Sequence, residues 1–477
     1  MSENYTGISD EAQPLRGSAA EPPPSVSINR ELKWLTSASI PLVGTYYLHY
    51  MFGFLNIISL GTWGGKALGA YALGNLTSAI LAFAPAVGIA SVLDTLCAAS
   101  FAHFGAGPQV GLHLQRGILA VTIWYCVVLV VIHFLLPTIF EVLGQNRELS
   151  EPATAYIRIL SLGLWPWMAF ECLKRYVQAN TQMRLPTMVL GCVVPFHLLN
   201  HWLFVWRVSD SASFTVVAWI TVVSYWAMFI GLAACTFYWN ALRPAWHAHG
   251  IKSLVSVSFY SLAAPAMIEA CGEYMAFELM TLLATYLGPT SLAAQAIAFS
   301  SMSMTFQLPH GVGGAAAVRI GQLLGQGQAS RARFSAKVLV VGALVYSMFG
   351  SLFFLTYGAN WVSMYTRDQD VLAIARKLIR VVALLEWTDA VRGIVPGILR
   401  GMGKQRLAAF INVGSYYFVV LPIASLAIYG FGMGIIGLWA AFAIGMTVLS
   451  ASYIAVTATT DWNTEARLCV ERIAPYA

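Results

Sequence analysis

The chain is poor in charge. Only 10% of its 477 residues are Asp, Glu, Lys or Arg, whereas 58% are hydrophobic, and the mean hydropathy is +0.68. Soluble domains carry about 25% charged residues, so this composition excludes an ordinary soluble protein and predicts a chain that lies mostly in a lipid bilayer. The formal net charge of +6 is therefore attributed to membrane topology, and no nucleic-acid partner is expected.

Several kinds of chemical site are also missing. The seven cysteines are scattered and form neither a disulfide framework nor a metal-ligand spacing. His197 and His201 are four residues apart, but a catalytic zinc needs a third ligand. No nucleophile–base pair or metal triad appears in the apolar segments. We therefore expect no metal, no organic cofactor and no enzyme activity.

Long apolar runs dominate instead. Each crossing of a bilayer needs about 20 apolar residues, and the runs are continuous rather than alternating, which favours helices over a β-barrel. We predict an all-α polytopic membrane protein with twelve transmembrane helices near residues 40–60, 70–96, 118–140, 155–173, 187–205, 216–238, 256–283, 292–318, 338–357, 378–399, 408–429 and 435–456.

The two halves of the chain resemble each other at an offset of about 224 residues. Pro41 and Pro85 then fall on Pro265 and Pro309. An even number of crossings per repeat makes the halves parallel, around a central cavity, and the prolines are expected to interrupt their helices. We predict a disordered cytoplasmic tail (1–33), two pseudo-symmetric six-helix lobes (34–245 and 246–460) and a cytoplasmic C-terminal tail (461–477).

Basic residues orient these helices. Of the 27 Lys and Arg residues, 19 lie in segments that a cytoplasmic N-terminus would place inside, among them Lys174, Arg175, Arg319 and Arg392. One stretch, 367–380, is an exception, because basic residues cluster there although this orientation places it outside. The positive-inside rule therefore predicts that both termini are cytoplasmic.

Acidic residues inside apolar segments point to function. Glu269, Glu273 and Glu278 lie in one apolar run, 254–287, that contains no basic residue, and Glu386 and Asp389 lie in the tenth segment. A charged side chain at the bilayer centre costs roughly 2.5–3.5 kcal/mol on insertion scales, so such residues usually face a cavity and handle ions, protons or charged substrates. On a straight helix Glu269 and Glu273 share a face, whereas Glu278 lies about 140° from Glu273.

A crowded carboxylate cluster in a low-dielectric cavity favours protonation. The deprotonated cluster attracts a cation, and the protonated cluster releases that cation. This exchange is the minimal physics of a proton/cation antiporter. Carboxylates turned toward acyl chains, or locked beside guanidinium partners, would overturn this mechanism. Nearby aromatic and Met side chains on the seventh and eighth segments suit an organic cation.

Several stretches resemble the eukaryotic multidrug and toxin extrusion (MATE) family. Residues 271–278, Cys-Gly-Glu-Tyr-Met-Ala-Phe-Glu, are similar to its Cys-Leu-Glu-Trp-Trp-x-[Phe/Tyr]-Glu segment. Residues 93–97, 319–327 and 399–403 resemble its Leu-Asp-Thr-Leu-Cys, Arg-Val-x-Asn-x-Leu-Gly-Ala-Gly and Leu-Arg-Gly-x-Gly elements. The likeness extends in order over roughly residues 35–457.

The resemblance implies a monomeric secondary transporter that exports organic cations, xenobiotics or metabolites in exchange for protons, in a plasma or vacuolar membrane. Its coupling acids carry over onto Glu273, Glu278 and Asp389. Its pocket aromatics carry over onto Tyr274, Phe277, Phe299 and Phe306.

This chain departs from the family pattern at a few positions. Ser300 stands where many animal members have a Glu, and Glu269 and Glu386 are additional acids. The first helix lacks the Asp that some prokaryotic members use. Substrate choice therefore stays open.

Two other functions remain as alternatives. A flippase for amphipathic lipid-linked precursors would share the two-lobe plan but would favour a basic cavity. An intramembrane enzyme lacks candidate catalytic groups, as described above.

Overall fold

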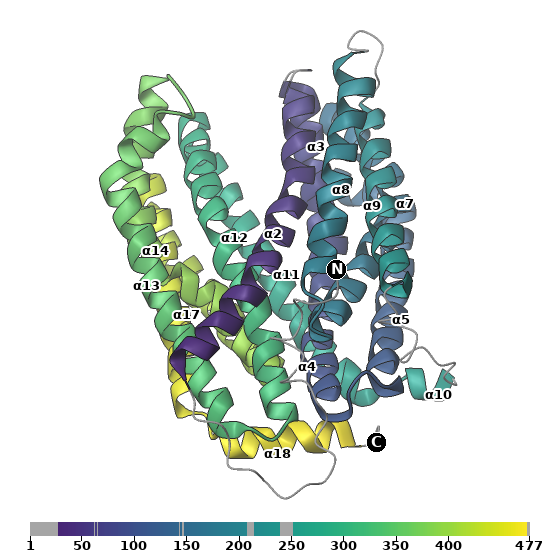
Figure 1. Ribbon diagram of the computed structural model, residues 1–477. Helices are drawn as coiled ribbons and strands as arrows, with labels where there is room; N and C mark the ends of the chain where they lie inside the picture. The colour runs from purple at the N-terminus through teal and green to yellow at the C-terminus, as the bar shows by residue number, and fades with distance from the viewer. Residues whose placement is uncertain are drawn as a thin grey trace, which may run out of the picture. The chain divides into compact units, whose positions relative to one another are not determined.

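The computed structural model describes residues 27–61, 63, 65–142, 144–145, 147–207, 214–238 and 251–474, which form helices and no strand. Residues 1–26 of the predicted N-terminal tail lie outside this part of the chain. The elements, shown in Figure 1, are α2 (Ile28–Gly61), α3 (Gly65–Ser78), η1 (Ala79–Phe83), α4 (Ala84–Phe104), α5 (Pro108–Val130), η2 (Val131–Leu135), α6 (Leu136–Val142), α7 (Arg147–Ala179), α8 (Arg184–His201), η3 (Trp202–Trp206), α9 (Thr215–Tyr238), α10 (Ile251–Leu254), α11 (Val257–Tyr286), α12 (Pro289–Gly325), α13 (Ala329–Val362), α14 (Gln369–Met402), α15 (Gln405–Val413), η4 (Gly414–Val420), α16 (Leu421–Ser425), η5 (Leu426–Gly430), α17 (Gly434–Thr459) and α18 (Trp462–Ile473).

The twelve predicted crossings are confirmed as long helical segments. Among the described residues, seven segments are long and apolar enough to span a bilayer by composition. The other five, α2, α7, α11, α12 and α14, are 30–37 residues long but contain more polar or charged side chains. Those five helices carry nearly all the buried ionisable residues discussed below.

The described chain divides into two compact units. The first unit contains Gly44–Met267, and the second contains the start of α2 up to Val43 together with the chain from Ile268 onward. The division between the units runs through α2 and α11. The lobes at 34–245 and 246–460 stay a prediction, and the boundary between them lies outside the described residues.

Proline and π-helical turns shape the helices. Pro41, Pro265 and Pro309 lie inside α2, α11 and α12, where each removes a backbone donor. Pro85 lies two residues after the end of the π-helical turn η1, and a missing backbone donor favours such a local change in hydrogen bonding.

In the second unit α12 and α14 pack at very short distance because glycines line their contact. A Cβ on Gly393 would lie 2.6 Å from the Pro309 Cβ, and a Cβ on Gly401 would lie 2.8 Å from the Ala317 carbonyl. A Cβ on Gly313 or on Gly397 would overlap the backbone of the facing helix. Only glycine permits this approach.

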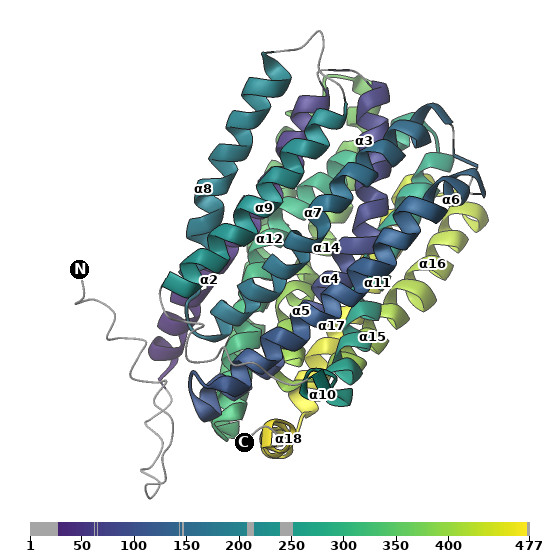
Figure 2. The same ribbon diagram turned by 90° about the vertical axis from the view of Figure 1, so that its right-hand side faces the viewer.

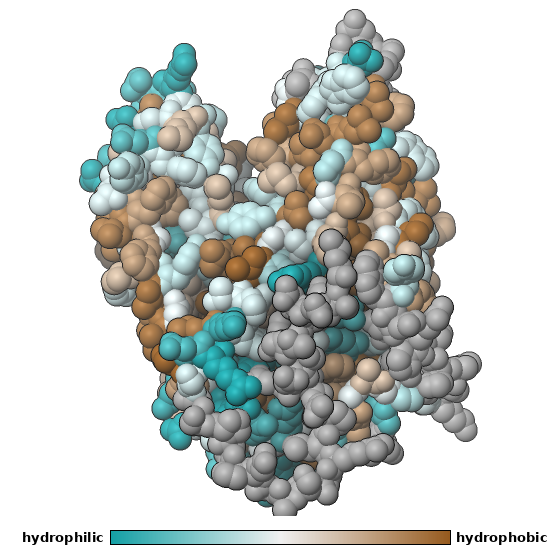
Figure 3. Space-filling model, in the orientation of Figure 1, coloured by the Kyte–Doolittle hydropathy of each residue, from teal (hydrophilic) through white to brown (hydrophobic). Residues whose placement is uncertain are grey.

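The outward face of α13 is hydrophobic. Figure 3 shows hydrophobic side chains over the middle of this helix and hydrophilic ones near its ends. The exposed residues include Val341, Leu344, Val345, Met348, Phe349, Leu352 and Phe353. Such an exposed apolar band matches the hydrocarbon layer of a membrane.

The helix α18 occupies the segment that we predicted as a C-terminal tail. It packs across α12 and α13, at the base of Figure 1, and Figure 2 views it end-on. The Asp461 carboxylate caps it by accepting from the Asn463 amide at 3.1 Å, and hydrogen bonds with Thr464 and Asn463 lower the pKa of Asp461. Lys404 and Glu465 form an ion pair of 2.9 Å that holds α18 to the start of α15.

Candidate functional site

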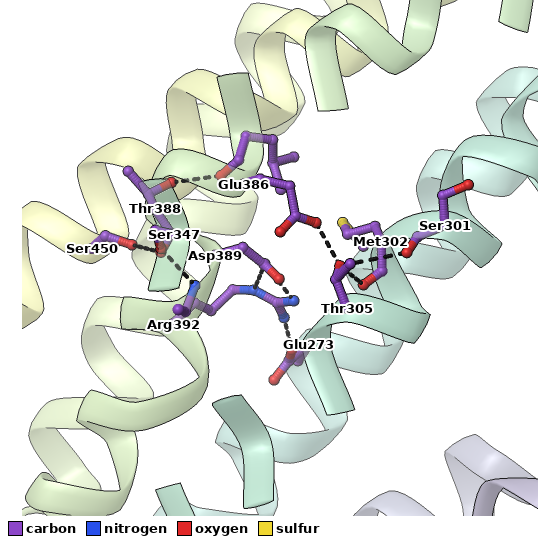
Figure 4. Close-up of polar contacts among 12 residues, drawn as sticks. Glu273, Ser301, Met302, Thr305, Ser347, Glu386, Thr388, Asp389, Arg392 and Ser450 are labelled. Atoms are coloured by element: carbon purple, nitrogen blue, oxygen red, sulfur yellow. Dashed lines mark hydrogen bonds and ion pairs between the residues drawn. The ribbon is translucent and has the colours of Figure 1, made fainter. Parts of the chain in front are cut away.

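The second unit brings acidic residues of α11 and α14 onto one guanidinium. Arg392 donates from Nε to Asp389 Oδ1 at 2.9 Å and from Nη1 to Glu273 Oε1 at 2.5 Å. Figure 4 shows its side chain directed between the two carboxylates. Asp389 and Arg392 are three residues apart on one face of α14, and the planar guanidinium has enough N–H groups to serve both acids.

Burial differs within this group. The side chains of Arg392 and Asp389 are 4% and 2% exposed, whereas that of Glu273 is 29% exposed. Asp389 is therefore enclosed by protein. Glu273 is the member of the group that a ligand reaches most easily.

The Arg392 contacts were not expected from the sequence. We had counted Arg392 among the cytoplasmic residues, and the apolar run 254–287 contains no basic residue. Because the guanidinium comes from α14, the apolar run of α11 gave no sign of it. The signal that was present is the spacing of Asp389 and Arg392, three residues apart in an apolar segment.

Other basic residues counted as cytoplasmic are also buried partners of acids. Lys174 pairs with Glu171 and Arg175 with Asp94, and Arg319 pairs with Glu31. Each of these cations is at most 5% exposed. The positive-inside sum therefore included side chains that serve internal ion pairs.

Glu386 lies one turn before Asp389 and has a different environment. Its Oε1 accepts a hydrogen bond of 2.6 Å from the Thr305 hydroxyl, and its side chain is almost fully buried. Tyr346 donates to the Thr305 carbonyl at 3.0 Å and holds that turn of α12 in place. In the described part of the chain, Glu386 makes no ion pair.

Glu269 and Glu278 occupy different faces of α11, as the helical geometry predicts. Glu269 is buried and has Arg400 and Glu273 as its charged neighbours. Glu278 is half-buried and, within the described residues, forms no hydrogen bond or ion pair. Of the five acids, Glu273 and Asp389 are therefore joined through Arg392, and Glu386 lies one turn from Asp389 with Thr305 as its partner. Glu269 and Glu278 lie outside these contacts.

Aromatic rings cover the guanidinium. The Arg392 Cζ lies 3.8 Å from the Phe306 ring centre and 5.7 Å from that of Phe277. Phe277 in turn contacts Phe299 at 5.3 Å between ring centres and Phe442 at 5.5 Å. These faces attract a cation, and here they surround the protein's own cation.

The remaining predicted substrate residues are less closely tied to this group. Tyr274 is 44% exposed. Ser300 is half-buried on α12, beside Phe299 in the chain. Sequence reasoning missed Thr305, whose hydroxyl binds Glu386, because a Thr in a membrane helix carries no distinguishing pattern.

His197 and His201 form a hydrogen-bonded pair in the first unit. Their Nε2 atoms are 3.1 Å apart, and their Nδ1 atoms contact Ser224 and Ser59 at 2.8 and 2.7 Å. All four ring nitrogens thus have protein partners, and no group of three metal-ligating residues occurs among the described residues. This geometry gives no support to a metal site.

Within the described residues, long helices, seven of them apolar enough to span a bilayer, and a group of buried acids are the features of a polytopic membrane transporter. The sequence model of the MatE family matches residues 41–203 and 265–426. The chain belongs to this family of transporters.

Relatives support that assignment. An uncharacterized transporter of Schizosaccharomyces pombe is 32% identical over 422 residues, which cover 88% of this chain and 77% of the relative. Multidrug and toxin extrusion protein 2 of Mus musculus is 26% identical, covering 92% and 76% of the two chains. The crystal structure of the eukaryotic MATE transporter AtDTX14 has the same fold, with a TM-score of 0.85, 23% identity and coverage of 93% of this chain and 99% of that chain.

Proposed function

We propose that the protein is a proton-coupled antiporter that exports organic cations by alternating access. The observation that carries the proposal is the surplus of buried acid around Arg392. One guanidinium binds both Glu273 and Asp389, and Glu386 adds a third carboxyl without an ion pair of its own. The mouse relative is named for multidrug and toxin extrusion, which supports export of small foreign compounds.

The guanidinium partner changes the mechanism that we expected. Because Glu273 and Asp389 are bound to Arg392, neither is a free carboxylate that simply waits for a proton. In our proposal Arg392 acts as a built-in cation, and a substrate cation competes with it for Glu273, the more exposed acid. The aromatic faces of Phe306 and Phe277 serve whichever cation is present.

Proton uptake has a second effect in this scheme. Glu386 lies next to Asp389 on α14 and takes a proton without breaking an ion pair. Protonation of Glu386 removes one negative charge near Arg392. The guanidinium is then attracted mainly to Asp389 and Glu273, and it displaces the substrate cation from Glu273. Glu269 and Glu278 supply further negative charge along α11.

The membrane placement remains part of the proposal. Both termini are cytoplasmic, the protein is a monomer, and its membrane is the plasma or vacuolar membrane. No organic cofactor takes part, and the proton is the coupling ion.

A transport screen in proteoliposomes tests the proposal. Purified full-length protein is given an imposed pH gradient with the membrane potential clamped, and the flux of tetraethylammonium, ethidium and other organic cations is compared with the flux under a sodium gradient. We expect cation flux that follows the pH gradient. Flux driven only by sodium, or no cation flux, would refute proton-coupled export.

Two substitutions test the acids. Glu278→Gln and Asp389→Asn should both slow proton-driven flux, because each removes a carboxylate from the site; Glu148→Gln, on an exposed residue that pairs with Lys66, is the control. Wild-type rates in both variants would reject the role of these acids. Movement of lipid-linked pyrophosphates without cation flux would favour the flippase.

A further inference from the structure

The first unit contains a second buried group of titratable residues, on α2 and α7. Trp167 Nε1 donates to His49 Nε2 at 2.7 Å, and His49 Nδ1 lies 3.9 Å from Glu171 Oε1. Glu171 also binds Lys174 at 2.5 Å. Glu171 and Lys174 are each only 2% exposed, and this group belongs to no site described above.

The hydrogen bond from Trp167 assigns the proton on His49. An indole N–H is only a donor, so His49 Nε2 must supply a lone pair. The imidazole is then neutral, with its single proton on Nδ1. That N–H lies on the side of Glu171, at a distance longer than a hydrogen bond.

Glu171 has unused capacity beside this ring. Its Oε1 is bound by Lys174, while its buried Oε2 has no hydrogen-bond partner among the described residues. A buried carboxylate oxygen without a donor is unfavourable, and a charged donor nearby would relieve it. His49, on α2, has its Nδ1 3.9 Å from Oε1 of the same carboxylate and becomes a charged donor beside it once protonated.

We propose that His49 and Glu171 form a second proton-binding site, located in the first unit. A proton from the aqueous phase binds Nε2 of His49, which converts that atom from acceptor to donor and breaks its bond with Trp167. The imidazolium ring then turns so that its Nδ1–H donates a hydrogen bond to the Glu171 carboxylate. The proton leaves from Nε2 when Trp167 regains its acceptor.

The charged groups around His49 permit this cycle. Lys174, on α7, opposes a second positive charge, whereas Glu171 attracts it. Arg175 of α7 is neutralised by Asp94 of α4, and on the far side of Phe52 lies neutral His197 of α8. Glu171 and Lys174 therefore act in opposite directions on a protonated His49 ring.

Release of Trp167 also gives the proton a structural consequence. The Trp167 ring lies 4.6 Å from Phe83, which ends the π-helical turn η1, and 5.6 Å from His49. Protonation therefore frees a ring that braces the irregular turn preceding α4.

The test counts protons per transported cation, and so it rests on the proposed proton coupling. Vesicles contain purified wild-type protein, His49→Gln or the control His133→Gln, with the potential clamped and a fixed gradient of tetraethylammonium, or of whichever cation the screen above shows to be transported. The pH difference that just stops net flux is measured. A tenfold cation gradient is balanced by about one pH unit if one proton exchanges and by about half a unit if two exchange.

We expect the balancing pH difference to double in His49→Gln, whose amide oxygen still accepts from Trp167 but binds no proton, and to stay at the wild-type value in His133→Gln. An unchanged value in His49→Gln would overturn the second site while leaving proton coupling intact. Absence of proton-driven flux in the wild type would refute the proposed function and this inference with it.

A second variant keeps the proposal testable if His49→Gln does not fold. Trp167→Phe retains an aromatic ring but removes the donor that favours neutral His49. The pH midpoint of transport, measured at equal pH on both sides, should move upward by up to about one unit, because a hydrogen bond to the neutral form is lost. A merely structural Trp167 would change the rate but not this midpoint, and an unshifted midpoint overturns the inference.

Discussion

The two units treat buried charge differently. In the first unit, Asp94 and Arg175 form one pair and Glu171 and Lys174 another, so each buried acid has its own cation. The second unit also has such a pair, Glu31 with Arg319. There, however, Glu273 and Asp389 share Arg392, and Glu386 makes no ion pair within the described residues. A one-to-one pair stabilises the structure and leaves proton uptake to a neutral neighbour, which in our proposal is His49. The acids around Arg392 outnumber their cation, so they can accept a proton or an external cation themselves without losing that internal partner.

The largest expected effect is on stability. Asp94→Asn leaves Arg175 buried without its counterion, which should cost about 3–5 kcal/mol. Asp389→Asn should cost less, because Arg392 keeps Glu273. Thermal unfolding of both purified variants in detergent measures the difference, and an equal loss in the two would break the comparison between the units.

Transport gives the next effect. Glu386→Gln keeps an oxygen for the Thr305 hydroxyl but binds no proton. The coupling free energy between two bound ligands is typically about 1–3 kcal/mol, so loss of this proton should lower proton-driven cation flux by roughly tenfold. Flux per folded molecule is compared with Glu148→Gln in the same vesicles. Normal coupling in Glu386→Gln would mean that the surplus acid has no transport role.

Selectivity should change more modestly. Ser300→Glu adds an acid one residue from Phe299, on the helix that supplies Phe306. We expect the relative rates among organic cations to shift toward more highly charged ones, because of the added negative charge. A rate profile identical to the wild type for a panel of cations would show that position 300 does not contact substrate.

The smallest effect concerns α18. Burial raises the pKa of Cys469 to about 11, so at pH 8 this thiol is almost entirely protonated and should react slowly with a maleimide. Leu468→Cys, on the 39% exposed neighbour, should be labelled much faster. Peptide mass spectrometry compares the two sites, and equal labelling would indicate that α18 detaches from α12 and α13.

Much of the fold follows from the sequence alone. Continuous apolar runs predicted all twelve long helical segments, because hydrophobic length is a strong signal in a membrane protein. The helix α18 was missed, since it is short and amphipathic and its stability comes from contacts such as that of Lys404 with Glu465. The unit boundary within α2 could not be read from composition, since it depends on tertiary contacts.

The site was only partly predictable. The acids stood out because carboxylates are rare in apolar runs, and the 3.6-residue period correctly separated Glu278 from Glu269 and Glu273. Arg392 was misplaced because it comes from a different helix, and partners across helices depend on packing. The same reason hid Thr305 and the contact of Trp167 with His49.

The glycine seam between α12 and α14 has a consequence for how the site responds to change. Backbones in such close contact have no side chains between them that could rearrange to let α12 slide past α14. The two helices therefore move together, and Thr305 stays beside Glu386. Resistance or loss-of-function variants should therefore appear at Gly313 and Gly397, several turns away from the carboxylates, with no altered group in the site itself.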